Sequence, residues 1–480
     1  EYTMKQIKKT VLVLLTAALF AGCNDWFDVK PKTEIRAEDL FKTERGFWNA
    51  LTGVYLNMAN REAYGGNLSW EGIEFMAWQH KNNTTLGAYY DLQRGNYTAT
   101  SSVNFINKTW LRLYNIIAEA NYLLFALDEY GSYLSPAVYD HIKGQCLGIR
   151  AYCHFDLMRL FAQGNLAADP SSLTKPCIPY VTAYSKEITP QQSYSWTLNR
   201  ALQDVMEARD LLDAGEYPKE QRVSTEKNTL LNVPGAMDLL AARIELWRGN
   251  TEAALPHITD HVDSLLKNTT VGITNDESIF KISVYNLFTW TEKRWEVTNN
   301  NRLISVTPNS VEANLFMILP YQANYGVDKT DLRYLNWYDP YEEGDPEKWG
   351  DRSIKVEYFT NSDENYITLM RLSEMLLIAA ECQLAKGTSE GKAKAIELVN
   401  YLRHRRGNPS GYDVADDVAD TDLLEIIRLE QLREVSQEGQ AFFLYKRINQ
   451  ERPINSENPM TAAEYVLPYP QGEQQVGHQQ

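Results

Sequence analysis

Residues 375–402 read MLLIAAECQLAKGTSEGKAKAIELVNYL, and this stretch decides the fold class. Apolar residues recur at helical spacing on both sides of Gly387, which predicts two helices joined by a short turn. A glycine just past the end of the first helix permits that turn. Ala379, Ala380 and Ala395 lie on the two predicted helices, where small side chains let paired helices approach closely. The stretch therefore predicts a helical hairpin.

Residues 239–266 repeat this plan. Ala241 and Ala242 lie in an alanine-rich first helix, a turn is predicted at Gly249, and a second helix is predicted from Thr251 onward. The spacing resembles that of tetratricopeptide repeats. Such repeats cannot bury their apolar faces alone, so they stack into a scaffold with the loops on one face.

The rest of the chain separates into helical blocks and a loop-rich insert. Helical periodicity dominates residues 37–266 and 366–447, whereas strand-like alternation occurs only in short pieces such as 353–359. Residues 269–363 lose the periodicity and are rich in Asn, Gly, Pro, Tyr and Trp. Inserts of this kind are usually functional or disordered, and the many aromatic residues favour order. We predict a mostly α protein, a tetratricopeptide-like helical-repeat scaffold with a long loop-rich insert.

The first residues have the pattern of a lipoprotein signal peptide. From Met4, a basic segment is followed by an apolar core at 11–20, and Ala21 and Gly22 directly precede Cys23. Small residues before a cysteine suit a lipoprotein signal peptidase, so Cys23 is the predicted lipid attachment site. An ordinary cleaved signal or a buried N-terminal helix is the alternative. We expect four regions: a signal peptide at 1–22, an N-terminal helical region at 23–268, the aromatic insert at 269–363 and a C-terminal helical region at 364–480.

Charge and cysteine content exclude several classes of protein. The formal net charge of -16 argues against nucleic acid, because phosphates require basic patches. After Cys23 no stretch of about 18 apolar residues occurs, so we expect an anchored protein and not a membrane-spanning one. Cys146, Cys153, Cys177 and Cys382 form no C-x-x-C pair, which disfavours a redox or zinc motif. Cys146 and Cys153 lie in an apolar helical stripe, where buried thiols are expected.

The sequence contains none of the common catalytic motifs. G-x-S-x-G, H-E-x-x-H, a Walker loop and a dinucleotide fingerprint are all missing. His257 and His261 have a spacing that could hold a metal, but no third ligand is evident and an exposed helix face explains them better. A glycosidase carboxylate pair stays open as an alternative, because its geometry cannot be derived from sequence. We expect no catalytic residues, no cofactor and no metal, with a structural calcium ion left open.

Aromatic residues outside the helical stripes are the best binding candidates. Tyr, Trp and Phe make up 11% of the chain. Apolar faces of sugar rings stack on aromatic faces, and each stack should contribute about 1 kcal/mol, by analogy with aromatic pairs. The alternative is that these rings seal the cores of irregular loops. The candidate glycan-binding residues are Trp70, Trp78, Asn82, Asn83, Tyr89, Tyr90, Arg94, Trp290, Trp295, Trp337 and Tyr338.

Six stretches share their patterns, in order, with one family. Residues 369–381 (LMRLSEMLLIAAE) are similar to an Arg-x-x-Glu-x-x-Leu-x-x-Ala-Glu-Ala helix, and 395–407 (AIELVNYLRHRRG) to an Asn-x-Ile-Arg-x-Arg-Ala/Gly helix. The others are 110–121 (WLRLYNIIAEAN), 150–161 (RAYCHFDLMRLF), 430–447 (EQLREVSQEGQAFFLYKR) and 467–471 (LPYPQ). Together they resemble the SusD/RagB family of nutrient-binding outer-membrane lipoproteins of Bacteroidetes.

The resemblance implies a function as well as a fold. It implies a surface lipoprotein, anchored in outer-membrane lipid, that captures a glycan and delivers it to a SusC-like TonB-dependent transporter. Asp25 and Asp28 are similar to the family's surface-export signal. A peptide-binding member of the family and a glycoside hydrolase remain alternatives.

The chain also departs from the family pattern. Gln431, Ala441 and Leu444 replace the typical Arg, Arg and Asp of the charged stretch at 430–447. We therefore expect part of a buried ion-pair network to be missing there, with an effect on the scaffold and not on the family assignment.

Overall fold

The computed structural model describes residues 37–80, 89–214, 235–272, 277–284, 287, 326–328, 330–339, 352–353, 365–454 and 456–478. The chain divides into two units, Glu1–Gly46 and Phe47–Gln480. Helix α2 (Ala37–Leu40) belongs to the first unit. The predicted signal peptide and Cys23 lie outside the described residues.

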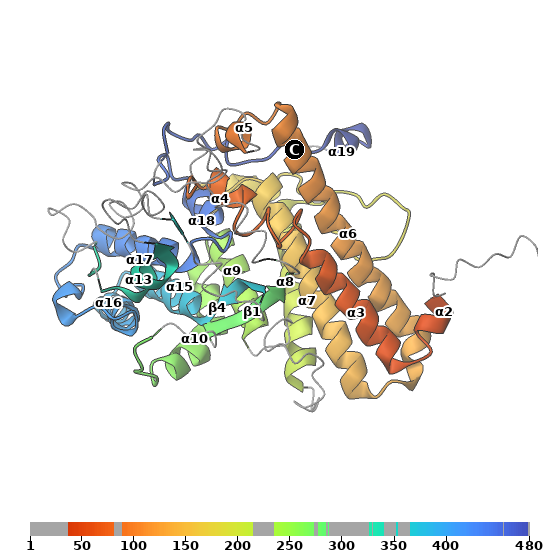
Figure 1. The fold of residues 1–480 in the computed structure, drawn as a ribbon, viewed down its shortest axis with the longest axis horizontal. Helices are drawn as coiled ribbons and strands as arrows, with labels where there is room; N and C mark the ends of the chain where they lie inside the picture. The colour runs from red at the N-terminus through yellow and green to blue at the C-terminus, as the bar shows by residue number, and fades with distance from the viewer. Residues whose placement is uncertain are drawn as a thin grey trace, which may run out of the picture. The chain divides into compact units, whose positions relative to one another are not determined.

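Long helices make up the N-terminal half of the second unit. Helices α6 (Thr100–Tyr130), α7 (Pro136–Phe161) and α8 (Tyr194–Ala214) pack in sequence, α6 on α7 and α7 on α8 (Figure 1). Helix α3 (Glu44–Met58) contacts α7 where the Tyr55 hydroxyl donates to Gln145 at 2.9 Å. Helix α7 begins sharply because Ser135 accepts a hydrogen bond from the Val138 N–H and Pro136 occupies the first helical position.

The two predicted hairpins are confirmed. Helices α9 (Ala236–Arg248) and α10 (Thr251–Leu265) form one, and α15 (Leu372–Ala385) and α16 (Ser389–Arg405) form the other. Gly249 ends α9 with a φ of +88°, which glycine adopts without strain. Helix α10 packs against α15, so the hairpins stack as tetratricopeptide-like repeats do (Figure 1).

The predicted helical block at 366–447 is wrong at its start, where the chain forms one strand of a small antiparallel sheet. Strand β4 (Tyr366–Arg371) pairs with β1 (Ser278–Ser283), with Ile367 opposite Ile282. Both strands are buried, so their side chains lack the alternation that marks a half-exposed strand. A second pair joins β2 (Tyr338–Asp339) to β3 (Arg352–Ser353). Of the predicted strand at 353–359, only its first residue is described.

The predicted helical block at 37–266 also contains irregular chain. Residues 162–193 form turns and extended backbone between α7 and α8, apart from one short 3-10 helix, Pro170–Thr174. Prolines at 170, 176, 179 and 190 lack the N–H that a helix interior requires. Among the described residues, the remaining short helices are α4 (Gly72–Met76), α5 (Tyr90–Gln93), α13 (Leu332–Trp337), α18 (Ala441–Ile448), α19 (Gln471–Gln475) and two 3-10 turns, Gly131–Tyr133 and Ser410–Tyr412.

Buried ion pairs join the helices of the C-terminal half. Glu430 and Glu434 on α17 (Asp420–Val435) are fully buried and both accept from Arg333 of α13, at 2.8 and 3.1 Å. Arg403 and Arg406, at the end of α16, add a bond to each of these carboxylates at 2.8 Å. The charged stretch that resembles the family therefore pairs its carboxylates with arginines from two other helices.

The four cysteines named above are all buried and free. Burial raises the pKa of Cys146, Cys177 and Cys382 to about 12, because a thiolate loses its hydration there. The prediction that Cys146 and Cys153 are buried thiols is confirmed.

Candidate functional site

The loop after α4 carries a strained tryptophan. Trp78 has a φ of +57°, a conformation that is costly for a bulky side chain and that often marks functional sites. Its ring is only 5% exposed, and its indole N–H is buried without a hydrogen-bond acceptor among the described residues. Asn82 and Asn83 follow it in sequence but lie outside the described residues.

Tyr90 and Arg94, at the two ends of α5, meet near Trp78. The Arg94 guanidinium carbon lies 3.8 Å from the centre of the Tyr90 ring and 5.7 Å from that of Trp78. Arg94 also donates to Glu457 at 2.8 Å, which holds it in place from a distant segment. Tyr90 and Arg94 are partly exposed. We call Trp78, Tyr90 and Arg94 the aromatic–arginine cluster.

Tyr89 faces inward beside this cluster. Its ring stacks on Phe75 with centroids 4.9 Å apart, and its hydroxyl lies 3.4 Å from Glu71 and 3.5 Å from Asn67. Burial, together with the nearby Glu71 carboxylate, raises the pKa of Tyr89 above its usual value. Tyr89 therefore supports the loop from inside.

Two other candidate rings lie in the core. Trp70 is 1% exposed and its indole N–H donates to the Gly65 carbonyl at 3.1 Å. Trp337, on α13, is fully buried, with the Arg371 guanidinium 5.5 Å from its ring centre. In this structure neither ring has a face to offer a ligand, which matches the alternative of sealed loop cores.

The remaining candidates fall in the insert. Trp290 and Trp295 lie outside the described residues. Tyr338 is placed only as part of strand β2. The structure thus brings together three of the predicted residues, Trp78, Tyr90 and Arg94, with Tyr89 behind them.

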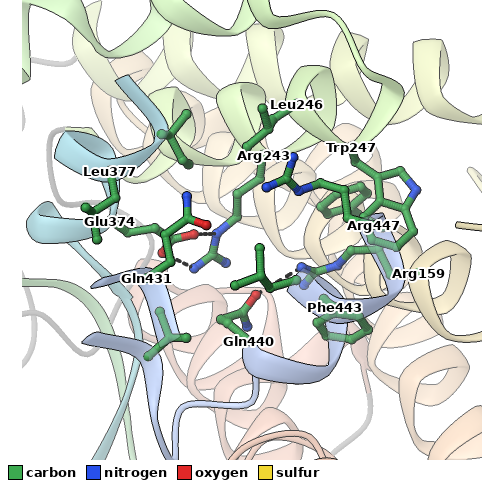
Figure 2. A pocket seen from close by; sticks show the side chains of 14 residues that line it. Arg159, Arg243, Leu246, Trp247, Glu374, Leu377, Gln431, Gln440, Phe443 and Arg447 are labelled. Carbon is green, nitrogen blue, oxygen red and sulfur yellow. Dashed lines mark hydrogen bonds and ion pairs between the residues drawn. The ribbon is translucent and has the colours of Figure 1, made fainter. Parts of the chain in front are cut away.

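A pocket of about 70 Å³ lies inside the scaffold (Figure 2). Its charged side chains are paired: Arg243 donates to Glu374 at 2.6 and 2.7 Å, and Arg447 donates to Glu381 at 2.6 and 2.7 Å. The volume suits a few water molecules. Gln431 and Leu444, two of the three departures from the family pattern, line this pocket. The pocket therefore lies among scaffold side chains, beside two of the positions predicted to depart from the family pattern.

The histidine pair at helical spacing is accounted for within the scaffold. His261 on α10 makes a 2.8 Å contact with the Asp238 carboxylate on α9. Burial lowers the pKa of His257, because the charged imidazolium loses hydration. Within the described parts of the chain, no group of three or more His, Cys, Asp or Glu side chains could hold a metal ion. The described helices also include none long and apolar enough to cross a membrane.

Comparison with known proteins identifies the family. The SusD family model matches residues 284–479, and a second model, described as starch-binding and associating with the outer membrane, matches residues 25–228. A SusD-like protein of Formosa agariphila is 24% identical over 93% of this chain and 92% of its own length.

Solved structures agree on the fold. A SusD-like carbohydrate binding protein from Bacteroides vulgatus superposes with a TM-score of 0.66 at 19% identity, covering 90% of this chain and 96% of that one. A SusD superfamily protein from Bacteroides thetaiotaomicron gives a TM-score of 0.63 at 20% identity, covering 90% and 98%. From its two family matches, its relative and its fold, this chain belongs to the SusD/RagB family.

Proposed function

We propose that this protein is a non-catalytic, surface-exposed lipoprotein that captures an oligosaccharide or polysaccharide and delivers it to a SusC-like TonB-dependent transporter. The observation that carries the proposal is the match of residues 25–228 to a family described as starch-binding and associating with the outer membrane. The relative whose name states carbohydrate binding shares the fold over 90% of this chain.

The aromatic–arginine cluster supports a neutral, hydroxylated ligand. Tyr90 offers a ring face of the kind on which an apolar sugar face stacks, worth about 1 kcal/mol by analogy with aromatic pairs. Arg94 carries several N–H donors in a fixed plane and is held by Glu457 and the Tyr90 carbonyl. A paired guanidinium attracts anions weakly but still donates hydrogen bonds to hydroxyl groups.

The carboxylates near the cluster support binding without catalysis. Glu71 is fully buried, and Arg61 donates to its two oxygens at 2.7 and 2.8 Å. Burial raises the pKa of Glu71 despite the attraction of Arg61, but a side chain with no exposed surface cannot protonate a glycosidic oxygen. Glu457 is the Arg94 partner. Both acids are paired with an arginine, and Glu71, the one with a raised pKa, has no exposed surface to meet a ligand.

The proposed lipid anchor and the proposed transporter partner are supported by the sequence. The signal peptide pattern ending at Cys23 supports lipid attachment, and two or more acyl chains would hold the protein stably at the membrane. Such a tether would keep the binding face beside a transporter embedded in the same membrane.

The site is tested by affinity gel electrophoresis against a panel of neutral polysaccharides. Replacing Tyr90 or Arg94 by Ala should weaken retention about fivefold to tenfold, since each removes about 1 to 1.4 kcal/mol of contact. Trp196→Ala is the matched control, because Trp196 on α8 is an exposed ring, 44% accessible, outside the cluster. Unchanged retention in both variants would remove the cluster from the site.

Two further readouts test the other parts of the proposal. Release of sugar products from a retained polysaccharide would contradict the non-catalytic assignment. Copurification of a TonB-dependent transporter with the tagged, full-length lipoprotein from detergent-solubilised outer membranes is expected. A Cys23→Ser variant should be lost from the membrane fraction, and retention there would contradict the lipid anchor.

A further inference from the structure

A second hollow is lined by residues of helices α6, α7 and α8 and of the segment 182–184. Its volume is about 370 Å³, within the range of small-ligand sites. Helices α6 and α7, which both contribute lining residues, run side by side (Figure 1). None of the glycan-binding candidates predicted from the sequence lines this hollow. We call it the helical groove.

Aromatic rings form one wall of the helical groove. Phe125 on α6 is 48% exposed and Tyr184 is 61% exposed, which is unusual for rings of this size. Tyr122, three residues before Phe125, stacks on it with centroids 6.4 Å apart and contacts Tyr184 at 4.8 Å. Phe125 and Tyr184 line the groove, and Tyr122 contacts both rings without lining it. We call Tyr122, Phe125 and Tyr184 the aromatic platform.

The rest of the rim is polar and its charges are balanced. The Tyr139 hydroxyl donates to Asp128 at 2.6 Å, and Lys143 pairs with Glu207 at 2.8 Å. Arg150 donates two bonds to the Asp204 carboxylate, at 2.6 and 2.7 Å, and Arg200 pairs with the same carboxylate. Among the lining residues, two carboxylates, Asp128 and Glu207, balance the two cations, Lys143 and Arg150. The helical groove therefore offers hydrogen-bonding atoms without a net charge that would select an ion.

The segment that carries Tyr184 is held in place before any ligand arrives. Arg150 donates to the Thr182 carbonyl at 3.1 Å and Asn121 donates to the Val181 carbonyl at 2.9 Å. The Val181 N–H donates to His154 at 3.0 Å. Because these bonds already order the segment, binding pays little of the usual ordering cost.

These features together favour a sugar over other occupants. A net charge of -16 disfavours nucleic acid. A stable protein interface needs about 800 Å² per partner with an apolar centre, and the two exposed rings that line the groove, Phe125 and Tyr184, are a small part of that. An exposed, pre-ordered aromatic wall with neutralised donors and acceptors matches a neutral sugar ring, whose faces are apolar and whose edges carry hydroxyl groups.

We propose that the helical groove is a second carbohydrate subsite, separate from the aromatic–arginine cluster, that takes roughly one or two sugar rings. This inference rests on the proposed function. The two sites lie toward opposite ends of α6: Tyr89, beside the cluster, packs on Phe105, whereas the platform includes Phe125. Twenty helical residues span about 30 Å, so a short oligosaccharide fills each site independently.

A long glycan that engages both sites gains avidity. Once one site is occupied, the second binds from a raised local concentration, so a polysaccharide is retained more strongly than either site alone allows. The helical groove would then select long chains at the cell surface.

Isothermal titration calorimetry with a short oligosaccharide of whichever polysaccharide is retained in the gel tests the inference. We expect two equivalents for the wild-type protein, one for the double variant Phe125→Ala/Tyr184→Ala, and two for Arg94→Ala, with one of its two sites weakened about fivefold to tenfold. Trp196→Ala should keep two equivalents. Phe125 and Tyr184 are both exposed, so thermal melts should show the double variant to be folded.

The outcomes separate the two proposals. One equivalent in the wild type, or two in the double variant, would overturn the second subsite while leaving the proposed function intact. Two equivalents retained in the double variant, with transporter copurification lost, would identify the helical groove as a protein-docking surface and overturn the sugar assignment. Absence of binding across the whole polysaccharide panel would overturn the proposed function and the subsite with it.

Discussion

At the scale of single residues, aromatic side chains that are equally good binding candidates in the sequence differ in how deeply they are buried. Trp70 and Trp337 are sealed in the core, whereas Tyr90 is partly exposed beneath a guanidinium. Phe125 lies three residues after Tyr122 on one helix, a spacing that equally suits a buried stripe. A ring becomes a candidate for binding only when its neighbours leave a face open.

Gly439 shows how closely a single position can be constrained. Its φ is +74°, its N–H donates to Glu74 at 2.9 Å, and a Cβ there would lie 2.1 Å from the Leu68 carbonyl oxygen. We expect Gly439→Ala to lower the free energy of unfolding by about 3 kcal/mol, because backbone strain and a backbone clash add together. Urea denaturation measures this change.

The control for this variant is Gly387→Ala. Gly387 has a similar φ of +65°, but nothing lies within 4 Å of a Cβ there. Gly387→Ala should lower the free energy of unfolding by only about 1 kcal/mol, the cost of the left-handed conformation. Equal losses in the two variants would show that the approach of Leu68 is unimportant.

At the scale of elements, buried charges connect segments far apart in the chain. Arg406, the residue after α16, binds Glu434 of α17 and also Glu277, next to strand β1, with shortest contacts of 2.8 and 2.7 Å. Arg371, at the end of β4, pairs with Glu438. The sheet, the repeat helices and the described part of the insert are thus held by one set of ion pairs.

Removing one charge from this set should be costly. Glu434→Gln keeps the side-chain shape but leaves Arg406 and Arg333 undercompensated in a buried site, so the free energy of unfolding should fall by about 3 kcal/mol. Glu397→Gln removes an exposed partner of Lys394 and should change stability by less than about 0.5 kcal/mol. Chemical denaturation of both variants tests the contrast, and similar small changes would mean that the pairs contribute little.

At the scale of the whole molecule, these pairs make stability depend on pH. Burial alone would raise the pKa of Glu430 and Glu434, but attraction from the neighbouring arginines outweighs it and lowers both below the usual 4.5. A carboxyl with a lower pKa in the folded state binds fewer protons than in the unfolded state. Its stabilising effect is complete above about pH 4.5 and is lost as the pH falls further.

The melting temperature should therefore fall steeply as the pH drops from about 4.5 to 3. Differential scanning calorimetry from pH 7 to 3 measures this, and the Glu434→Gln variant should show a shallower decline because one titrating group is gone. A parallel decline in the two proteins would show that Glu434 is not among the groups responsible.

Local patterns predicted the repeat hairpins, the buried thiols and the family, because helical periodicity, small residues and turn glycines act between neighbours in the chain. They also singled out Tyr90 and Arg94, which the structure brings together. The Cys23 anchor stays a prediction from the same kind of pattern.

Only the tertiary structure decided features that depend on distant contacts. Strand β4 lies in a block that the sequence predicts to be helical. The pattern does not reveal the strand because its partner β1 lies more than 80 residues earlier and both strands are buried. The burial of Trp337, the charge set around Glu434 and the platform at Phe125 and Tyr184 were likewise set by packing. Sequence specifies which faces are apolar, but which face stays open depends on what the rest of the chain places against it.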